Sequence, residues 1–270
     1  MNATTQTVTR VTWRAGDSLQ DSDEVVAETP VALVYNGVSH VVMMSTPADL
    51  EDLALGFSLS EGILEHPQQL LDCELQQRAN GMELALTISS ERFALLKQRR
   101  RNLTGRTGCG LCGLESLEQA VPAPARVGSD CRLSHLALDR AVIGLGQRQS
   151  LKRLTGGVHG AAWCNLAGDI ELLREDVGRH NALDKLLGAL RRMESISKYS
   201  EPGFVLVTSR ASYEMVAKAA SSNIAILAAV SAPTSLAISQ AGEAGVTLVG
   251  FVQAGRHVIY THPRRFVEGP

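Results

Sequence analysis

Strands and helices alternate through the carboxyl-terminal third of the chain, and this alternation limits the fold more than any other feature of the sequence. Three apolar runs have the length and composition of buried strands: 204–207, 224–230 and 246–251. Helical patterns over 213–220 and 234–240 separate them. Such alternation is typical of a sheet covered by helices. We therefore predict a layered α/β sheet, to which residues 258–261 can add another strand.

Two Asn-Gly pairs, at 36–37 and 80–81, indicate β-hairpins in the amino-terminal third. Asn-Gly accepts the positive φ angles of a two-residue turn and is the strongest short signal for a hairpin. The strands that these turns connect are 31–35 with 38–44, and 70–76 with 82–88. We expect a β-rich region whose first ordered strand begins near Glu28.

Two helices complete this region. The first is predicted to open with Thr46 as its cap and Pro47 as its first residue, and to end near Gly62. Its apolar residues recur at helical spacing: Leu50, Leu53, Ala54 and Phe57. The second helix covers 91–101 and leads into a cysteine-containing loop.

The middle of the chain contains fewer regular patterns. Residues 121–129 are rich in proline, alanine and glycine and are typical of a linker. We predict a helix over 136–151, a hairpin that turns at Gly168-Asp169 and an amphipathic helix over 181–193, with Glu175-Asp176 near its positive end. The predicted units are an amino-terminal β-rich region with two helices (1–101), a mobile cysteine-containing loop and linker (102–132) and an α/β domain (133–270).

The sequence Arg106 to Gly113 places Cys109 and Cys112 three positions apart among three glycines. Glycines this dense weaken regular structure, so we expect an exposed loop with accessible thiols. Five cations lie nearby and favour the nucleophilic thiolate: Lys97, Arg99, Arg100, Arg101 and Arg106. A reactive sulfur is our first hypothesis.

The spacing of the cysteine pair is also compatible with half a zinc site, a thioredoxin-like redox pair and two inert structural cysteines. Zinc needs further ligands, and the remaining cysteines Cys73, Cys131 and Cys164 form no second pair. A thioredoxin-like motif belongs at a strand–helix junction, whereas this pair follows a basic helix. Inert cysteines are usually buried in apolar surroundings. We expect no metal site.

Composition excludes several classes of protein. Of the 270 residues, 44% are hydrophobic and 20% are charged, with a net charge of -2, which argues against disorder and against a general nucleic-acid-binding surface. The amino terminus has no apolar signal core, and no apolar run reaches membrane-spanning length. Five scattered cysteines fit a reducing compartment. We expect a cytoplasmic protein without a nucleic-acid or membrane partner.

Small, polar and cationic residues follow the predicted strands of the α/β sheet. These residues are Thr208-Ser209-Arg210, Ser231 and Gln253 to Arg256. Ligands of open α/β sheets bind beyond the carboxyl ends of the strands, and hydroxyl and guanidinium groups suit a phosphate-bearing ligand. The alternative for Ser209 and Ser231 is helix capping.

A polar cluster over 175–185 could also hold an anionic ligand, through Arg179 and His180 at the start of a helix. His159 and His180 both occur in glycine-containing turns, so we assign both to a site rather than to the core. Zinc deaminases combine H-x-E with P-C-x-x-C. Gly108 precedes Cys109, and no glutamate lies two residues after His159, which disfavours deaminase chemistry.

Several long motifs, in the same order, resemble those of the FdhD family of formate dehydrogenase accessory proteins. The similar segments span nearly the whole chain: 30–44, 55–63, 106–113, 155–163, 175–185, 209–215, 227–235 and 248–263. The resemblance implies a fold like that of cytidine deaminases with an added β-rich region, and a homodimer.

The resemblance also implies a function, that of a sulfurtransferase. A cysteine desulfurase would load a persulfide onto Cys109, and the sulfur would pass to a molybdenum or tungsten bis-guanine-dinucleotide cofactor that formate dehydrogenase then receives. Cys112 would have an auxiliary role. The segment Phe251, Val252, Gln253, Ala254, Gly255 and Arg256 would bind the cofactor as a substrate, with no permanently bound cofactor. The alternative is a non-catalytic cofactor-binding chaperone whose cysteine pair holds zinc.

Overall fold

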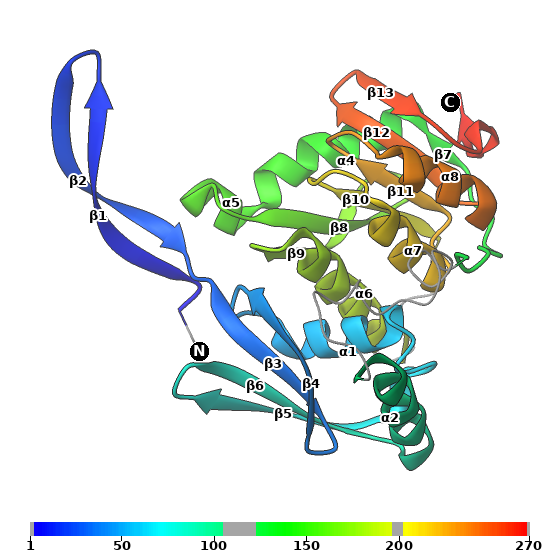
Figure 1. The fold of residues 1–270 in the computed structure, drawn as a ribbon. Helices are drawn as coiled ribbons and strands as arrows, with labels where there is room; N and C mark the ends of the chain where they lie inside the picture. Colours follow the sequence, from blue (N-terminus) through cyan, green and yellow to red (C-terminus); the bar gives the residue numbers. More distant parts are fainter. Residues whose placement is uncertain (1–2, 105–122, 196–201, 269–270) are drawn as a thin grey trace.

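The computed structural model describes residues 3–104, 123–195 and 202–268. Two sheets lie side by side, the larger with a hydrophobic core on each face and the smaller with one core, and a long two-stranded arm projects from them (Figure 1). This mixed architecture confirms the expected α/β class with an added β-rich amino-terminal region. No helix in the described ranges has the length and apolar character needed to cross a membrane.

The larger sheet has six strands in the order β13-β12-β11-β10-β8-β9. Strands β10, β11 and β12 are parallel, whereas β8, β9 and β13 join antiparallel. The strand bounds are β8 His159–Asn165, β9 Ile170–Asp176, β10 Gly203–Val207, β11 Ile226–Ala229, β12 Thr247–Gln253 and β13 Arg256–Ile259. This sheet contains the alternating strands and helices predicted from the sequence.

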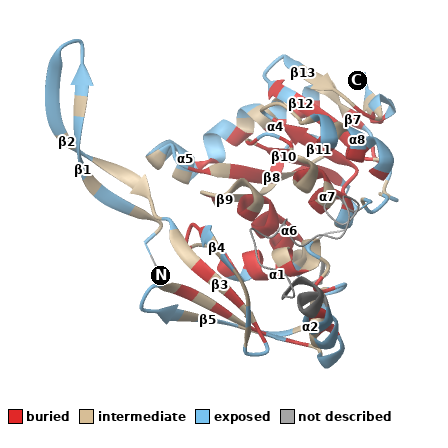
Figure 2. Ribbon diagram, in the orientation of Figure 1, coloured by how far each residue is buried: buried red, intermediate tan, exposed pale blue. Residues whose placement is uncertain are grey.

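Helices cover both faces of this sheet. One core packs α6 (Arg179–Ser195), α7 (Tyr213–Ser221) and α8 (Ser235–Ala244) against the strands. The opposite core is closed by α4 (His135–Arg148), and α5 (Ser150–Thr155) follows it directly. Strand β7 (Leu133–Ser134) pairs parallel with β14 (Phe266–Val267), and this short pair extends the second core. Strand β14 directly follows the η2 turn Pro263–Arg265. Figure 2 shows buried residues along the strands and along α6.

The smaller sheet has four strands in the order β4-β3-β6-β5. Its elements are β3 Thr29–Tyr35, β4 Val38–Ser45, α1 Leu50–Ser60, η1 Pro67–Gln69, β5 Leu70–Arg78, β6 Gly81–Ile88 and α2 Ser90–Thr104. Both predicted Asn-Gly hairpins are confirmed, and Asn36 (φ 45°) and Gly37 (φ 80°) have the expected turn geometry. Leu33, Leu53 and Leu84 are fully buried in its core.

The arm is the largest departure from the predicted structure. Strands β1 (Thr5–Arg14) and β2 (Asp17–Val26) pair antiparallel over their full length, so the expectation of no ordered strand before Glu28 is wrong. The arm lacks a buried apolar face, which is the signal on which strand prediction depends.

Two predicted helix boundaries are also wrong. The first helix begins at Leu50 after Asp49, not at Pro47, because Thr46 is buried and bonds Asp176 and Val177 instead. The helix expected over 136–151 breaks at Gln149 into α4 and α5.

Helices α1 and α6 join the two sheets by a close crossing between glycines. A Cβ atom on Gly56 would lie 1.8 Å from the carbonyl oxygen of Asp184, and one on Gly188 would lie 2.0 Å from that of Asp52. Only glycine fits at either position without moving a helix. Ion pairs surround the crossing: Arg174 to Asp52 (2.8 Å), Arg192 to Asp52 (2.7 Å) and Lys218 to Asp184 (3.1 Å).

Candidate functional site

The carboxyl ends of β10, β11 and β12 meet at one edge of the large sheet, where β8 begins and β9 ends. Hydrogen bonds join the segments along this edge. The Gly160 N–H donates to Thr208 Oγ1 (2.9 Å), and the Phe251 N–H donates to the Ser231 carbonyl (3.2 Å). The sheet therefore collects residues that are far apart in the sequence.

Most of the residues predicted for a site lie along this edge. His159 pairs with Asp176 where β8 meets β9, Ser209 and Arg210 follow β10, and Ser231 follows β11. The segment Phe251 to Arg256 ends β12 and turns into β13. Three strand spacings separate β12 from β8, or about 14 Å. An edge of this width can contact a ligand much longer than a single phosphate group.

Phe251, the first residue of this segment, has an unusual backbone conformation. Its φ angle is 53°, in the left-handed region, and the pairing of β12 with β13 is irregular between Gly250 and Gln253. A residue other than glycine in that region costs on the order of 1–3 kcal/mol, and such outliers cluster at ligand-binding sites. Phe251 is 41% exposed, so an apolar residue is open to solvent on the edge that also carries Ser231 and Arg256.

Arg179, Arg210 and Arg256 supply positive charge to the edge. Arg210 and Arg256 are exposed, and Arg179 is partly exposed at the start of α6. Within 3–104, 123–195 and 202–268, none of the three has an ion-pair partner. Their guanidinium groups are free of carboxylates there and suit phosphate oxygens.

The two histidines of the edge favour the neutral form. Burial lowers the pKa of His159, and the cations Lys152 and Arg179 lower it further against the opposing charge of Asp176. Burial also lowers the pKa of His180, although Glu214 opposes the shift. His180 Nε2 lies 2.9 Å from Glu214 Oε2, an ion-pair distance.

The helix-capping alternative for the two serines is wrong. Ser212 and Thr234 take the N-cap positions of α7 and α8, and Thr234 Oγ1 accepts a hydrogen bond from the Ala237 N–H. Ser209 is buried, and its hydroxyl donates to the Arg210 carbonyl.

The polar cluster over 175–185 divides between the site and the core. Asp176 and Lys185 are completely buried and form an ion pair of 2.6 Å, which sequence reasoning missed. Asp176 also accepts hydrogen bonds from the side chain of Ser45 and the backbone of Thr46, so it fixes β4 to β9. Glu175 accepts from two backbone N–H groups at the start of α5 and is its cap. No local sequence pattern shows these pairings.

Cys109 and Cys112 lie outside the described residues. The other three cysteines are free thiols, and two of them are buried. Burial raises the pKa of Cys164 to about 12 and that of Cys73 to about 11, and it also raises the pKa of Cys131. Protonated thiols are poor nucleophiles, so none of these three has the properties of a reactive sulfur.

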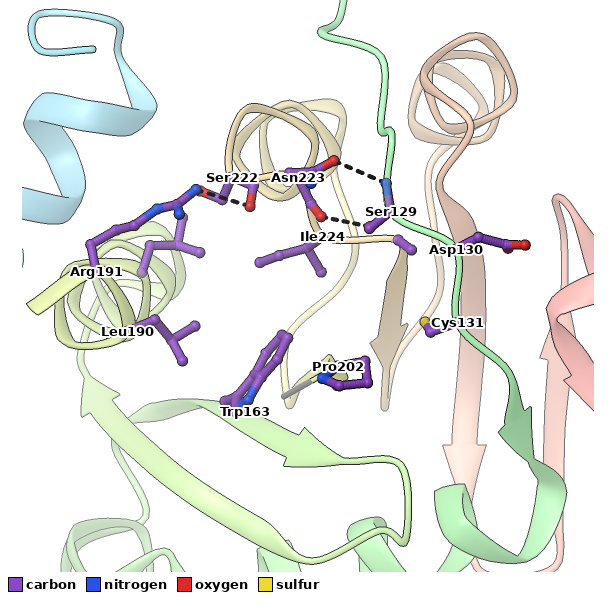
Figure 3. Close-up of a pocket in the computed structure, with 13 residues that line it drawn as sticks. Ser129, Asp130, Cys131, Trp163, Leu190, Arg191, Pro202, Ser222, Asn223 and Ile224 are labelled. Carbon is purple, nitrogen blue, oxygen red and sulfur yellow. Dashed lines mark hydrogen bonds between the residues drawn. The ribbon is translucent and has the colours of Figure 1, made fainter. Parts of the chain in front are cut away.

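A separate cavity of about 210 Å³ opens at the opposite edge of the large sheet (Figure 3). The ring of Trp163 and the side chains of Leu190 and Ile224 face it, with Arg191 and Asn223 at its rim. None of the predicted site residues lines this cavity. No sequence signal indicates it, because its lining comes from strand starts and helix ends with no common motif.

Comparison with known proteins matches residues 26–267 to the model of the FdhD/NarQ family. The chain is 56% identical to the "Sulfur carrier protein FdhD" of Cupriavidus necator, over 94% of this chain and 87% of that protein. It is 52% identical to the protein of that name from Xanthomonas euvesicatoria, over 95% and 90% of the two chains. A crystal structure of a candidate formate dehydrogenase accessory protein from Desulfotalea psychrophila has the same fold, with a TM-score of 0.73, 24% identity and coverage of 98% and 100%.

Proposed function

This chain belongs to the FdhD/NarQ family, and we propose that it is a sulfur carrier that supports formate dehydrogenase. The observation that carries the proposal is 56% identity to a protein named as a sulfur carrier, over 94% of this chain. The chain itself contributes the paired cysteines Cys109 and Cys112, with cations on their amino-terminal side.

The donor in the proposed reaction is a cysteine desulfurase, and the carrier atom is the sulfur of Cys109. The Cys109 thiolate attacks the outer sulfur of the donor's persulfide. A new S–S bond forms on Cys109, and the donor cysteine leaves as a thiolate. The reaction is a group transfer, so the protein acts as a sulfurtransferase. The raised thiol pKa values of Cys73 and Cys164 support the choice of Cys109 over these two.

The acceptor is the molybdenum or tungsten bis-guanine-dinucleotide cofactor, bound as a substrate. Its phosphates would bind Arg179, Arg210 and Arg256, which have no carboxylate partners within the described ranges. Phe251 offers an exposed ring, and Ser209 and Ser231 lie on the same edge. The outer sulfur of the Cys109 persulfide would then pass to the metal as a sulfide ligand, and Cys109 would leave as a thiolate. The metal would supply the two electrons by going from the +4 to the +6 state, and formate dehydrogenase would then receive the cofactor.

Mass spectrometry under non-reducing conditions tests the first transfer. The protein is incubated with an active cysteine desulfurase and free cysteine, and its peptides are analysed for added sulfur. We expect one reductant-sensitive extra sulfur on the peptide that contains Cys109. If no sulfur is added while the desulfurase is demonstrably active, the carrier proposal is wrong.

Matched cysteine variants identify the carrier atom. We expect Cys109→Ala to abolish transfer, and Cys112→Ala, three positions away in the sequence, to retain it. Substantial transfer by the Cys109 variant would refute the assignment. A zinc assay on freshly purified protein then tests the alternative of a cofactor-binding chaperone, because a zinc-holding pair would carry about one tightly bound ion per chain.

A further inference from the structure

A cluster of three aromatic rings joins the β12–β13 hairpin to α4 and β14. His135 Nδ1 lies 2.8 Å from His257 Nε2, and the two rings are stacked with their centroids 4.9 Å apart and an interplanar angle of 21°. Phe266 contacts both rings, at centroid distances of 5.0 Å from His135 and 5.3 Å from His257. Neither histidine was assigned to the site, yet His257 directly follows the segment that ends with Arg256.

Main-chain interactions fix two of the three rings. Strand β7 pairs with β14 so that Phe266 lies opposite Leu133, two residues before His135. Ser134 is the N-cap of α4, and its hydroxyl accepts a backbone hydrogen bond of 3.1 Å, so His135 is the first residue of that helix. His135 and Phe266 therefore form a fixed surface against which the ring of His257 packs.

His257 lies opposite a β-bulge. Where β12 pairs with β13, two residues of β12, Phe251 and Val252, oppose the single residue His257. A bulge disrupts the hydrogen bonds between strands and redirects side chains, and bulges are common beside functional sites. Phe251 is also the residue with a φ angle of 53°. The stacked histidines thus support the hairpin at the point where its own strand pairing is weakest.

The contact between the two histidines requires a nitrogen without a proton. At 2.8 Å, one ring N–H donates to the bare nitrogen of the other ring, and the tautomers decide which ring is the donor. The hydrogen bond persists while either ring is neutral. If both rings are charged, two N–H groups face each other and the bond is lost.

The environment of His257 disfavours its charged form. Burial lowers the pKa of His257 and the neighbouring His135 lowers it further, whereas Asp139 opposes the shift. A charged ring carries a proton on Nδ1, and that nitrogen is buried without a hydrogen-bond partner among the described residues. Because the pKa is lower in the folded protein, the cluster loses stability as the pH falls through about 6.5.

Few charged groups face the cluster from the elements around it. Helix α4 contributes the carboxylate of Asp139, and β14 contributes the uncharged ring of Phe266. The two bulge residues of β12 are apolar. Arg132, before β7, donates to the Arg264 carbonyl of η2. Within the part of the chain that the structure describes, Asp139 is therefore the carboxylate that acts on His257.

We propose that His135 and His257 are positioning residues for the site edge. While one of their facing nitrogens is bare, the stacked pair holds the bulge in the conformation that places Phe251 and Arg256 for a phosphate-bearing ligand. When both rings are protonated, the contact breaks and the hairpin is released from α4. The effect on ligand binding rests on the proposed function, whereas the release of the hairpin does not.

Hydrogen-exchange mass spectrometry of the full-length protein tests the release. After correction for the intrinsic exchange rate, protection of the β12 and β13 amides should fall about tenfold between about pH 7.5 and pH 5.5, the equivalent of one lost hydrogen bond. The β5–β6 hairpin is the internal control, because residues 70–88 contain no histidine. Equal changes in the two hairpins would overturn the proposal.

Variants of the cluster separate titration from packing. His257→Phe keeps a planar ring that cannot take up a proton, so protection of the hairpin should be the same at both pH values. His257→Ala removes the ring, and its hairpin should exchange rapidly at both. Asp139→Asn removes the carboxylate that opposes the shift, so the release should move to lower pH. If His257→Phe loses protection at low pH as the wild type does, the histidine pair is not the cause.

Guanosine diphosphate is the probe for the consequence at the site edge. Calorimetric titration should show that the wild type binds it about tenfold more weakly at about pH 5.5 than at about pH 7.5. His257→Phe should change by about threefold or less, and it also corrects for protonation of the phosphate itself. Equal weakening in both proteins would contradict the positioning role.

Substitutions on α4 complete the test. At about pH 7.5, His135→Ala should bind guanosine diphosphate about tenfold more weakly than the wild type. Leu136→Ala is the matched control, because Leu136 is the next residue of the helix and is 65% exposed, and it should bind within about threefold of the wild type. Equal binding by the two variants would refute the role of His135. A wild type that binds no guanosine diphosphate refutes the ligand assigned to the edge, while the exchange measurement still decides whether the histidines hold the hairpin.

Discussion

Replacing Lys185 by methionine is a direct test of the buried network that fixes β4 and β9 beside the site edge. Lys185 Nζ lies 2.6 Å from Asp176 Oδ2 and donates to the Thr46 carbonyl at 2.9 Å. Both members of the ion pair are completely buried. Methionine keeps most of the side-chain volume and removes the charge, so the Asp176 carboxylate is left without its cation.

We expect Lys185→Met to lower the free energy of unfolding by about 3–5 kcal/mol, the usual cost of removing one partner of a buried ion pair. At about 2–4 °C per kcal/mol for a chain of this size, the melting temperature should fall by roughly 6–20 °C. A calorimetric or circular dichroism melt measures this fall. Lys152→Met is the matched control, because Lys152 is exposed, and it should change stability by about 0.5 kcal/mol or less.

The same variant has a second signature in its pH dependence. The unpaired carboxylate can take up a proton instead of remaining charged in an apolar environment, so the difference between variant and wild type should narrow as the pH falls. Removing Asp176 as well should not restore stability, because Asp176 also satisfies Ser45 Oγ and the Thr46 and Gly178 N–H groups. If Lys185→Met melts within about one degree of Lys152→Met, the argument from burial is wrong.

Two further predictions concern the helix crossing and the site edge. Gly188→Ala should lower the free energy of unfolding by about 3 kcal/mol, since its Cβ would lie 2.0 Å from a backbone oxygen. Gly146→Ala is the control, because open space surrounds Gly146, and it should raise the free energy of unfolding by about 0.5–1 kcal/mol in the same urea titration. His159 should titrate below the usual 6.5 in NMR spectra. Because the pKa of His159 is lower in the folded protein than in the unfolded chain, the unfolded chain binds the proton first, and the protein loses stability as the pH falls through about 6.5. Melting curves of His159→Gln should show a smaller loss of stability over this pH range. An equal or larger loss would contradict the lowered pKa of His159.

The features that were predicted correctly depend on short-range chemistry. The hairpin at Asn36 follows from two residues that accept positive φ angles, and the alternation of strands and helices follows from local periodicity. The gathering of Ser209, Ser231 and Phe251 along one edge needed only the rule that parallel strands end together.

The features that were missed depend on contacts between distant segments. The carboxylates of Glu175 and Asp176 look equivalent in the sequence, yet one caps α5 and the other is buried against Lys185 and Ser45. Thr46 has the neighbours of a helix cap, but its tertiary bonds to Asp176 displace the helix start to Leu50. The arm was missed because strand prediction depends on a buried apolar face, and the arm is exposed in a single chain.

The crossing of α1 and α6 has an evolutionary consequence. A side chain at Gly56 or at Gly188 would collide with the backbone of the other helix and force the two helices apart. Separation would also break the ion pairs of Asp52 with Arg174 and Arg192. A single substitution at either glycine is therefore penalised whatever happens nearby in the sequence. We expect the two helices to be inherited as one unit, so chimaeras that take α1 and α6 from different relatives should fold only when both glycines and their charged partners are transferred together.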